Sequence, residues 1–229
     1  MIRVDDKYPL YFFDDYEFPN PYEEFHDGLA GASADLHPKR LLNGYSKGFF
    51  PWYQADDGMF HWYQIHKRMI LYTNKVKRTK NLNKKLRSKN WDFKINTNFE
   101  EVIKNCATIK RPIHMGGSWI SEDFINAYTN LNKLGYAMSV EAYFQNELVG
   151  GFYGVGIGKY FSGESMFAKK SDASKLALIY FCDLCQDNGI NWIDCQSGSE
   201  HLQRMGAELI PKTQFLEMLE IAVKKEIND

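Results

Sequence analysis

A carboxylate in an apolar, glycine-rich stretch is a candidate for acid–base chemistry in this chain. The stretch, residues 150–167, consists of β-branched and aromatic residues broken by glycines, which predicts a β-hairpin. Glu164 lies near its end, beside Met166 and Phe167. Removing a carboxylate from water is costly unless another group pairs with it. Taken alone, Glu164 is either a paired or exposed structural acid, or a functional one.

A second polar pair follows on a short predicted strand at residues 191–196. Residues two apart on a strand share a face, so we expect Asp194 and Gln196 to project together and Cys195 to point the other way. Strand ends beside helices are common positions for active sites in folds that combine helices with a sheet. The local pattern leaves two interpretations open, a catalytic pair or a polar pair that ends a loop.

Nucleophilic, metal and nucleotide chemistry find less support. Cys195 has no adjacent base that would lower its pKa. His201 is more typical of a hydrogen-bonded loop residue than of a catalytic one. Residues 154–159 lack the spacing of a phosphate-binding loop. The cysteines lack the second CxxC or the histidine pair of a zinc site, so reduced core thiols are expected at Cys106, Cys182, Cys185 and Cys195. No metal and no cofactor is predicted.

The charge distribution is uneven although the formal net charge is only −1. Residues 1–27 carry eight acids against two bases, whereas residues 67–89 carry ten bases and no acid. Such a basic run raises self-repulsion without structural gain, which favours contact with a polyanion over a merely solvated face. Lys84 and Arg87 are expected to point away from the stripe formed by Leu82 and Leu86.

The elements that must position these residues begin with a helix from Pro38 that ends at Gly48. An aromatic corner at residues 49–53 and an extended segment at 59–72 follow. We place a boundary near residue 62, with a small N-terminal unit of residues 1–62 before it. The basic segment then contains a short helix, and residues 93–96 alternate as a strand.

The second half alternates helices and strands. We expect helices capped by Thr97 with Glu100, by Ser121, and by Ser171 or Asp172. Residues 110–117 are expected to be loop, 136–144 and 148–155 strands, and the segment with His201 and the Met205-Gly206-Ala207 turn a loop. A buried helix ends at Gly189, and an amphipathic helix begins at Thr213. This order predicts an α+β fold over one sheet.

Composition limits the compartment and the protein class. The 229 residues are 44% hydrophobic, enough for a sizeable core. There is no basic segment followed by an apolar run at the N-terminus and no run of about 18 apolar residues. We therefore expect a cytoplasmic protein that does not enter a membrane.

Several dispersed motifs resemble the leucyl/phenylalanyl-tRNA-protein transferase family of bacteria, and their order and spacing together are specific. They are Asp35-Leu36 with Pro38, Arg40-Leu41-Leu42 and Tyr45; Gly48-Phe49-Phe50-Pro51-Trp52; Trp119-Ile120; Glu147-Leu148-Val149-Gly150-Gly151 with Tyr153-Gly154; Gly163-Glu164-Ser165-Met166-Phe167; Ala173-Ser174-Lys175; Ile193-Asp194-Cys195-Gln196; and His201-Leu202 with Gly206-Ala207. The resemblance runs from about Gly28 to about Phe215.

The resemblance implies a GNAT-like acyltransferase domain, residues 63–229, behind the small N-terminal domain. It implies transfer of Leu, Phe or Met from aminoacyl-tRNA to a protein that begins with Arg or Lys, which marks that protein for degradation under the N-end rule. Asp194 and Gln196 would be the catalytic pair, with Glu164 beside them. Trp52 and Trp119 would hold the terminal adenosine. The pocket for the transferred side chain would be formed by Phe152, Phe161, Met166, Leu178 and Phe181.

These roles suggest a division of labour in which Gln196, oriented by Asp194, holds the attacking amine. Asp194 would disperse the amine's proton, and Glu164 would attract the basic acceptor terminus. Lys84 and Arg87 would bind the tRNA backbone.

Two departures from the family pattern stand out. Ser33-Ala34 replaces a double glycine, and in residues 62–68 only Trp62 and Arg68 keep the family's residues. Two other functions compete with the transferase. A CoA-dependent N-acetyltransferase would need a glycine-rich pyrophosphate loop that opens the helix at about 171. The sequence has no such loop there. A non-catalytic RNA-binding module would leave Asp194, Gln196 and Glu164 without a role.

Overall fold

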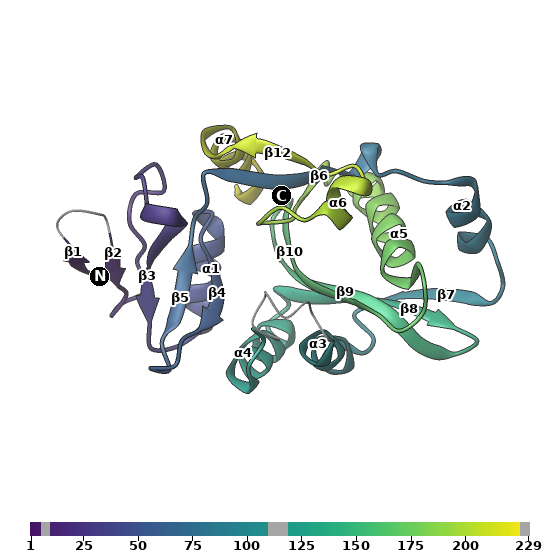
Figure 1. The fold of residues 1–229 in the computed structure, drawn as a ribbon, viewed down its shortest axis with the longest axis horizontal. Coiled ribbons are helices and arrows are strands. Elements are labelled where there is room, and N and C mark those ends of the chain that lie inside the picture. Colours follow the sequence, from purple (N-terminus) through teal and green to yellow (C-terminus); the bar gives the residue numbers. More distant parts are fainter. Residues whose placement is uncertain (6–9, 110–118, 225–229) are drawn as a thin grey trace, which may run out of the picture.

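The computed structural model describes residues 1–5, 10–109 and 119–224, which form two β-sheets joined by short connections (Figure 1). The smaller sheet has the strand order β1-β2-β3-β5-β4. Its strands are β1 (Ile2–Asp5), β2 (Leu10–Phe12), β3 (Leu29–Ser33), β4 (Phe50–Gln54) and β5 (Phe60–Tyr63). The larger sheet has the order β12-β6-β11-β10-β9-β8-β7. Its strands are β6 (Lys67–Tyr72), β7 (Trp91–Ile95), β8 (Ala137–Phe144), β9 (Glu147–Ile157), β10 (Tyr160–Ala168), β11 (Trp192–Asp194) and β12 (Glu208–Pro211).

The prediction of a single sheet was therefore wrong, although the mixed α+β class was right. Strand β5 lies within the extended segment expected at 59–72, whereas β1, β2 and β3 were not predicted, because they have only 4, 3 and 5 residues. The aromatic corner proved to be β4, in which Pro51 pairs with Trp62 of β5. Pro51 can be accommodated because β4 is an edge strand.

Helices cover both faces of the larger sheet (Figure 1). Helices α3 and α4 lie on one face, and α5 lies on the other. The α-helices are α1 (Pro38–Ser46), α2 (Lys80–Leu86), α3 (Phe99–Thr108), α4 (Glu122–Lys133), α5 (Ala173–Asp187), α6 (Glu200–Arg204) and α7 (Lys212–Val223), and the 3₁₀ helices are η1 (His26–Gly28) and η2 (Thr73–Lys75). Helix α6 replaces part of the loop expected around His201. The loop expected at 110–117 lies outside the described residues. None of the helices described is long and apolar enough to span a membrane.

The helix starts were predicted well, but the capping interactions were not. No side-chain cap bond is made by Asn98, Ser121 or Asp172, which precede α3, α4 and α5. Thr97 instead donates its hydroxyl to Glu141, and Ser121 donates to Gln54. Thr97 and Ser121 form hydrogen bonds with residues of other elements because each lies where two elements meet.

The two sheets share one hydrophobic cluster on the α4 side of the larger sheet. Phe49 and Trp62 from the smaller unit belong to the same cluster as Phe124 of α4 and Phe215 of α7. Gly48 is required at this junction, because its φ is +83° and an added Cβ would lie 2.9 Å from the Phe215 ring. The predicted boundary near residue 62 falls in β5, the last strand of the smaller sheet in chain order.

One crossover in the larger sheet determines the position of the functional residues. Strand β10 leads into α5, and β11 returns parallel to β10, paired with it only through Ser162 and Asp194. Beyond that pair the chain leaves β11 while β10 continues. Glu164 and Gln196 each follow the paired residues by two positions, so they lie where the two strands separate.

Candidate active site

Glu164 is the extra residue of a β-bulge. Gly163 pairs with Gly154 of β9 and Ser165 pairs with Tyr153, so Glu164 has no partner across the ladder. Bulges of this kind redirect a side chain and are frequent beside active sites. A Cβ on Gly154 would lie 2.3 Å from the Ser162 carbonyl oxygen, so this approach of β9 to β10 requires glycine.

The Glu164 carboxylate accepts hydrogen bonds from neutral donors. Gln196 Nε2 donates to Oε1 at 2.8 Å and Ser162 Oγ donates to the same oxygen at 3.1 Å. The Tyr128 hydroxyl donates to Oε2 at 3.4 Å and is itself in a short hydrogen bond with the hydroxyl of Tyr45. Within the described residues, no lysine or arginine forms an ion pair with Glu164. Burial, with a smaller contribution from the charge of Asp194, raises the pKa of Glu164 to about 7 against the lowering effect of its hydrogen-bond donors.

Asp194 has the opposite environment. It is fully buried, and Arg68 donates Nε to Oδ1 at 2.8 Å and Nη2 to Oδ2 at 2.6 Å. The Tyr160 hydroxyl also donates to Oδ2, at 2.6 Å. Arg68 reaches the first unit as well, through a bond from Nη1 to the Gly48 carbonyl at 3.1 Å. Both carboxylate oxygens are thus committed to a buried, charge-compensated network.

The predicted common face for Asp194 and Gln196 was wrong. Strand β11 ends at Asp194, and Gln196 has a φ of 54°, in the left-handed region, so the two-residue alternation of a strand no longer applies. The Gln196 backbone N–H donates to Asp194 Oδ1 at 2.8 Å, and its side chain turns to Glu164 and Ser162. Asp194 therefore holds the backbone of Gln196 from behind, while Gln196 and Cys195 both face the cavity.

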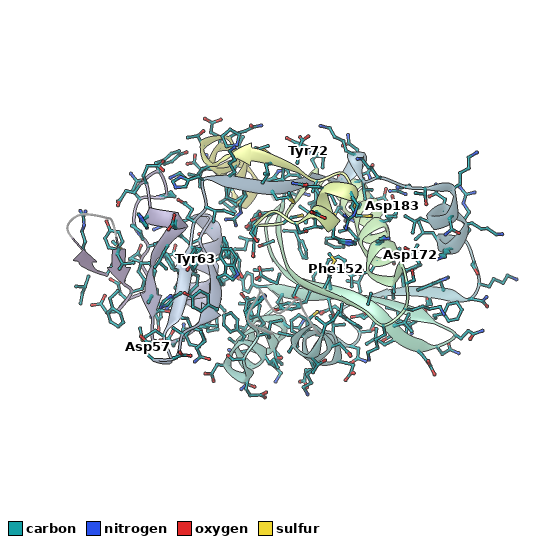
Figure 2. The ribbon with its side chains drawn as sticks, viewed as in Figure 1. Asp57, Tyr63, Tyr72, Phe152, Asp172 and Asp183 are labelled. Carbon is teal, nitrogen blue, oxygen red and sulfur yellow. The ribbon has the colours of Figure 1, made fainter. Side chains whose placement is uncertain are left out.

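A cavity of about 820 Å³ opens beside Glu164 and Gln196. Its wall combines polar groups from the strand ends with apolar side chains from β9, β10 and α5, and two tryptophans, one from each side of the junction. Its lining includes Trp52, Tyr53, Gln54, Trp119, Phe152, Glu164, Met166, Leu178, Ile193, Gln196, His201 and Leu202. An apolar chamber with a few convergent polar groups is the usual form of a small-ligand site. Phe152 lies near the centre of the larger unit (Figure 2).

The predicted pocket residues divide into two layers. Phe152, Met166 and Leu178 line the cavity, as do Trp52 and Trp119. Phe161 and Phe181 do not line it; they are buried behind Phe152, with ring centroids 6.4 and 5.4 Å from its ring. They support the apolar wall.

The predicted basic surface is smaller than the sequence suggested. Lys84 and Arg87 are exposed on and just after α2, away from the cavity lining. Arg68, counted among the ten bases, is buried with Asp194 and belongs to no surface. A count of charges along the chain cannot distinguish a strand residue that faces the core from an exposed one.

Several residues that organise the site were not predicted from the sequence, namely Arg68, Tyr160, Ser162, Tyr128 and Tyr45. One signal was present for Arg68, because Arg68 and Trp62 alone keep the family's residues in an otherwise altered segment. Both are buried, and the Trp62 indole donates to Ser33 Oγ at 2.8 Å. Tyr45 stands in one of the family-like motifs, whereas Tyr160, Ser162 and Tyr128 carry no comparable signal in the sequence, because only the fold brings them to the carboxylates.

His201 and the cysteines add no reactive nucleophile. His201 lies on α6 and lines the cavity, and burial lowers its pKa, as do Lys175 and Arg204. Its Nε2 is buried without a hydrogen-bond partner among the described residues. Burial raises the pKa of Cys195, and it raises that of Cys182 to about 12, so neither thiol is activated. No cluster of three metal-ligating side chains occurs in the described ranges.

Two family descriptions match this chain. "Leucyl/phenylalanyl-tRNA protein transferase" matches residues 70–220, and "Leucyl/phenylalanyl-tRNA protein transferase N-terminal domain" matches residues 34–64. The chain is 40% identical over 214 residues to a leucyl/phenylalanyl-tRNA–protein transferase of Idiomarina loihiensis, with 93% of this chain and 89% of that protein covered. The protein of that name from Neisseria meningitidis serogroup B is 40% identical over 230 residues, covering 96% and 95%.

Among solved structures, the similarities are weak. FemX matches with a TM-score of 0.45 and 12% identity, over 80% of this chain and 71% of that one. L-PGS from Bacillus licheniformis matches with a TM-score of 0.38 and 9% identity, over 72% and 51%.

Proposed function

The chain belongs to the leucyl/phenylalanyl-tRNA-protein transferase family, and we propose that its cavity transfers Leu, Phe or Met from aminoacyl-tRNA to proteins that begin with Arg or Lys. It is an aminoacyltransferase by family. The donor range, the acceptor residues and the marking of acceptors for N-end-rule degradation are the proposed part. One observation carries the proposal: Glu164 and Gln196, a polar pair without a cationic partner among the described residues, border an apolar chamber flanked by Trp52 and Trp119.

The architecture supports a GNAT-like catalytic domain. The antiparallel run β7-β8-β9-β10 is followed by helix α5 and the parallel strand β11, and β10 and β11 separate after one residue pair. That separation provides the site where the donor ester and the acceptor amine meet. We keep the domain division at residue 62 as part of this proposal, and the cytoplasm as the compartment, because the donor is an aminoacyl-tRNA.

The reaction needs little covalent help from the protein. An aminoacyl ester is activated, and an α-amine with a pKa of about 7.7 to 8.0 is partly neutral near pH 7.5. The amine nitrogen attacks the ester carbonyl carbon, the bond from that carbon to the ribose oxygen breaks, and an amide forms. One proton leaves the amine, and one is gained by the ribose oxygen. Alignment of the two reactants supplies much of the rate enhancement.

The geometry divides these tasks differently from the sequence-based proposal. Gln196 commits Nε2 to Glu164 and Ser162, which leaves its Oε1 to accept a hydrogen bond from the attacking amine. Glu164 is placed to receive the amine's proton, because it is on the cavity wall and its pKa is about 7. Asp194 is placed to orient Gln196, since its oxygens are occupied by Arg68, Tyr160 and the Gln196 backbone.

The apolar wall supports selection by shape. Phe152, Met166 and Leu178 fit an apolar side chain that is not branched at Cβ, with Phe161 and Phe181 keeping the wall rigid behind them. Such a pocket discriminates by about 1 to 3 kcal/mol per methylene, so relaxed choice among Leu, Met and Phe is expected. Ile and Val should be poor donors because branching at Cβ places a methyl group against the wall.

The test is transfer of radiolabelled leucine from leucyl-tRNA to a peptide that begins with Arg. We expect label in that peptide and none in the same peptide beginning with Asp. Valyl-tRNA should be a much weaker donor in the same assay. Equal transfer from valyl-tRNA would contradict the pocket assignment, and no transfer from leucyl-tRNA would contradict the proposed function.

A further inference from the structure

Helix α2 carries Lys80, Lys84 and Lys85 of the basic segment but has only seven residues. Isolated helices of this length are not stable in water, so α2 depends on its surroundings. Its first turn is capped by the Thr79 hydroxyl, which accepts from the Leu82 N–H at 3.2 Å. Leu82 and Leu86 contact the hydrophobic cluster beneath α5. Two leucines alone fix the orientation of a helix poorly, because apolar contact is not directional.

Two acids hold the segment at both ends: Asp172, which directly precedes α5, and Asp183, which lies in its second half; both are labelled beside this helix in Figure 2. Asp183 accepts two hydrogen bonds from the Arg78 guanidinium, one of them from Nη1 at 3.0 Å. Lys85 donates Nζ to Asp172 Oδ2 at 2.7 Å. The first pair lies just before α2 begins and the second lies in its last turn.

Asp172 is built for this contact. Its φ is 69°, in the left-handed region that costs most residues energy but suits Asp and Asn, and its side chain does not cap α5. The second oxygen, Oδ1, accepts from Lys175 Nζ at 2.9 Å, so one largely buried carboxylate bridges α2 and α5. The hydrogen bonds from Lys85 and then Lys175 lower the pKa of Asp172.

The bridge also leads toward the cavity. Lys175 lies close enough to His201 to lower its pKa, behind the larger effect of burial, and His201 lines the cavity. Asp172 therefore stands between the basic helix and one rim of the chamber.

Carboxylates at this position are electrostatically unfavourable for binding a polyanion. The exposed bases Lys77, Lys80, Lys84, Arg87 and Lys89 form no ion pair within the described residues. Each nearby acid reduces the attraction of this surface for phosphates. Because Asp172 and Asp183 weaken this attraction, we expect the geometry that they impose on α2 to provide a gain that offsets the loss.

We propose that Asp172 and Asp183 are positioning residues for the donor. They hold α2 against α5 so that its free bases and Lys175 present one rigid surface to the sugar–phosphate backbone of the aminoacyl-tRNA. The identity of the nucleic acid rests on the proposed function.

The direction in which the affinity for tRNA changes when one of these negative charges is removed tests this inference. Asp172→Asn and Asp183→Asn keep the side-chain size, and Asn tolerates the left-handed backbone at residue 172. If these acids only reduce the positive potential, both variants bind tRNA more tightly. If they position α2, both bind more weakly although they have gained positive charge, by about fivefold for Asp172→Asn. The matched control is Asp187→Asn, an exposed acid on the same helix without an ion pair among the described residues, which should bind as the wild type or slightly more tightly.

Binding of tRNA at several salt concentrations and steady-state transfer give the readouts. The Asp172→Asn variant should raise the KM for leucyl-tRNA with little change in kcat. The exchanged pair Arg78→Asp with Asp183→Arg keeps the net charge, and it should recover binding that Asp183→Asn loses. Tighter binding by both Asn variants, or binding unchanged from the control, would overturn the proposal. Lack of transfer with tRNA binding intact would instead overturn only the proposed function.

Discussion

Two carboxylates on neighbouring parallel strands of this protein have opposite environments. Asp194 ends β11 in the interior, paired with a buried arginine through two hydrogen bonds. Glu164 bulges from β10 at the cavity wall, and its partners in the described chain are an amide and hydroxyl groups. The residue that precedes Glu164 by two, Ser162, is the direct cross-strand partner of Asp194.

In the sequence, Asp194 and Glu164 are both simply acids of the candidate site. Their environments assign them two different functions. A buried carboxylate whose oxygens accept two hydrogen bonds from a guanidinium serves as a fixed, charge-compensated anchor. A carboxylate that is largely desolvated without a cation has a raised pKa and can exchange a proton near neutral pH. Pairs of acids whose environments differ in this way commonly divide the work of an active site.

The largest expected effect comes from breaking the anchor. Asp194→Ala leaves the Arg68 guanidinium buried without its partner, which should lower the free energy of unfolding by about 3 to 5 kcal/mol. Urea unfolding at pH 7.5 measures it. The double variant Arg68→Met with Asp194→Leu should recover much of this stability, because an apolar pair of similar volume often replaces a buried ion pair. It should still lack transfer activity, since Gln196 loses the carboxylate that holds its backbone. A loss below about 1 kcal/mol for Asp194→Ala would mean that the pair is not an anchor.

The next effect concerns Glu164 as the proton acceptor. Glu164→Gln should reduce kcat/KM by about 100-fold or more, within the usual range for loss of a general base, while the protein stays folded. In the wild type, two groups must lose a proton, the Glu164 carboxyl with a pKa of about 7 and the acceptor amine. Log kcat/KM should therefore rise with a slope approaching 2 below pH 7, and with a slope of 1 in Glu164→Gln. Identical pH profiles for the two proteins would assign the proton to another group.

The pH dependence of stability at Glu164 should be opposite to that of activity: the rate rises with pH, and the contribution of Glu164 to stability falls. The folded-state pKa of Glu164 is raised from 4.5 to about 7, so the native state binds more protons than the unfolded chain between these values. The contribution of Glu164 to stability therefore falls as pH rises through that window. The Tm of Glu164→Gln minus that of the wild type should become more positive from pH 5 to pH 8. A constant difference would mean that Glu164 titrates normally, and the contrast with Asp194 would lose its basis.

The sequence carried the identity of these residues but not their environments. Spacing placed Gln196 and Asp194 on a strand and Glu164 in a glycine-rich hairpin, and most helices and strands of the larger unit were predicted near their observed positions. The β-bulge was not predicted, because a bulge depends on the register with β9, which local sequence does not reveal. The left-handed backbone at Gln196 similarly depends on its bond to Asp194.

Long-range partners explain most of the remaining errors. Arg68 was assigned to a basic surface, and it reaches Asp194 from 126 positions away in the chain. Thr97 matches a helix-capping pattern, but its hydroxyl donates a hydrogen bond to Glu141 instead. Strands β1, β2 and β3 of the smaller sheet were not predicted because they are short. In each case the local sequence favours one arrangement, but a contact with a residue distant in the chain determines the observed one.

The smallest expected effect tests how finely Glu164 is tuned. Ser162 is fully buried, donates to Glu164 Oε1 at 3.1 Å and accepts from Gln196 Nε2 at 3.1 Å. Ser162→Ala removes a donor that favours the ionised carboxylate, so the pKa of Glu164 should rise and the rate profile should move to higher pH. Activity at pH 8 should fall only a few-fold, because one neutral hydrogen bond contributes about 1 kcal/mol. Ser165→Ala, a neighbouring change in the cavity lining, serves as the control and should leave the inflection in place. A shift to lower pH in Ser162→Ala would mean that its hydroxyl stabilises the protonated acid, contrary to the hydrogen bond that it donates to Oε1.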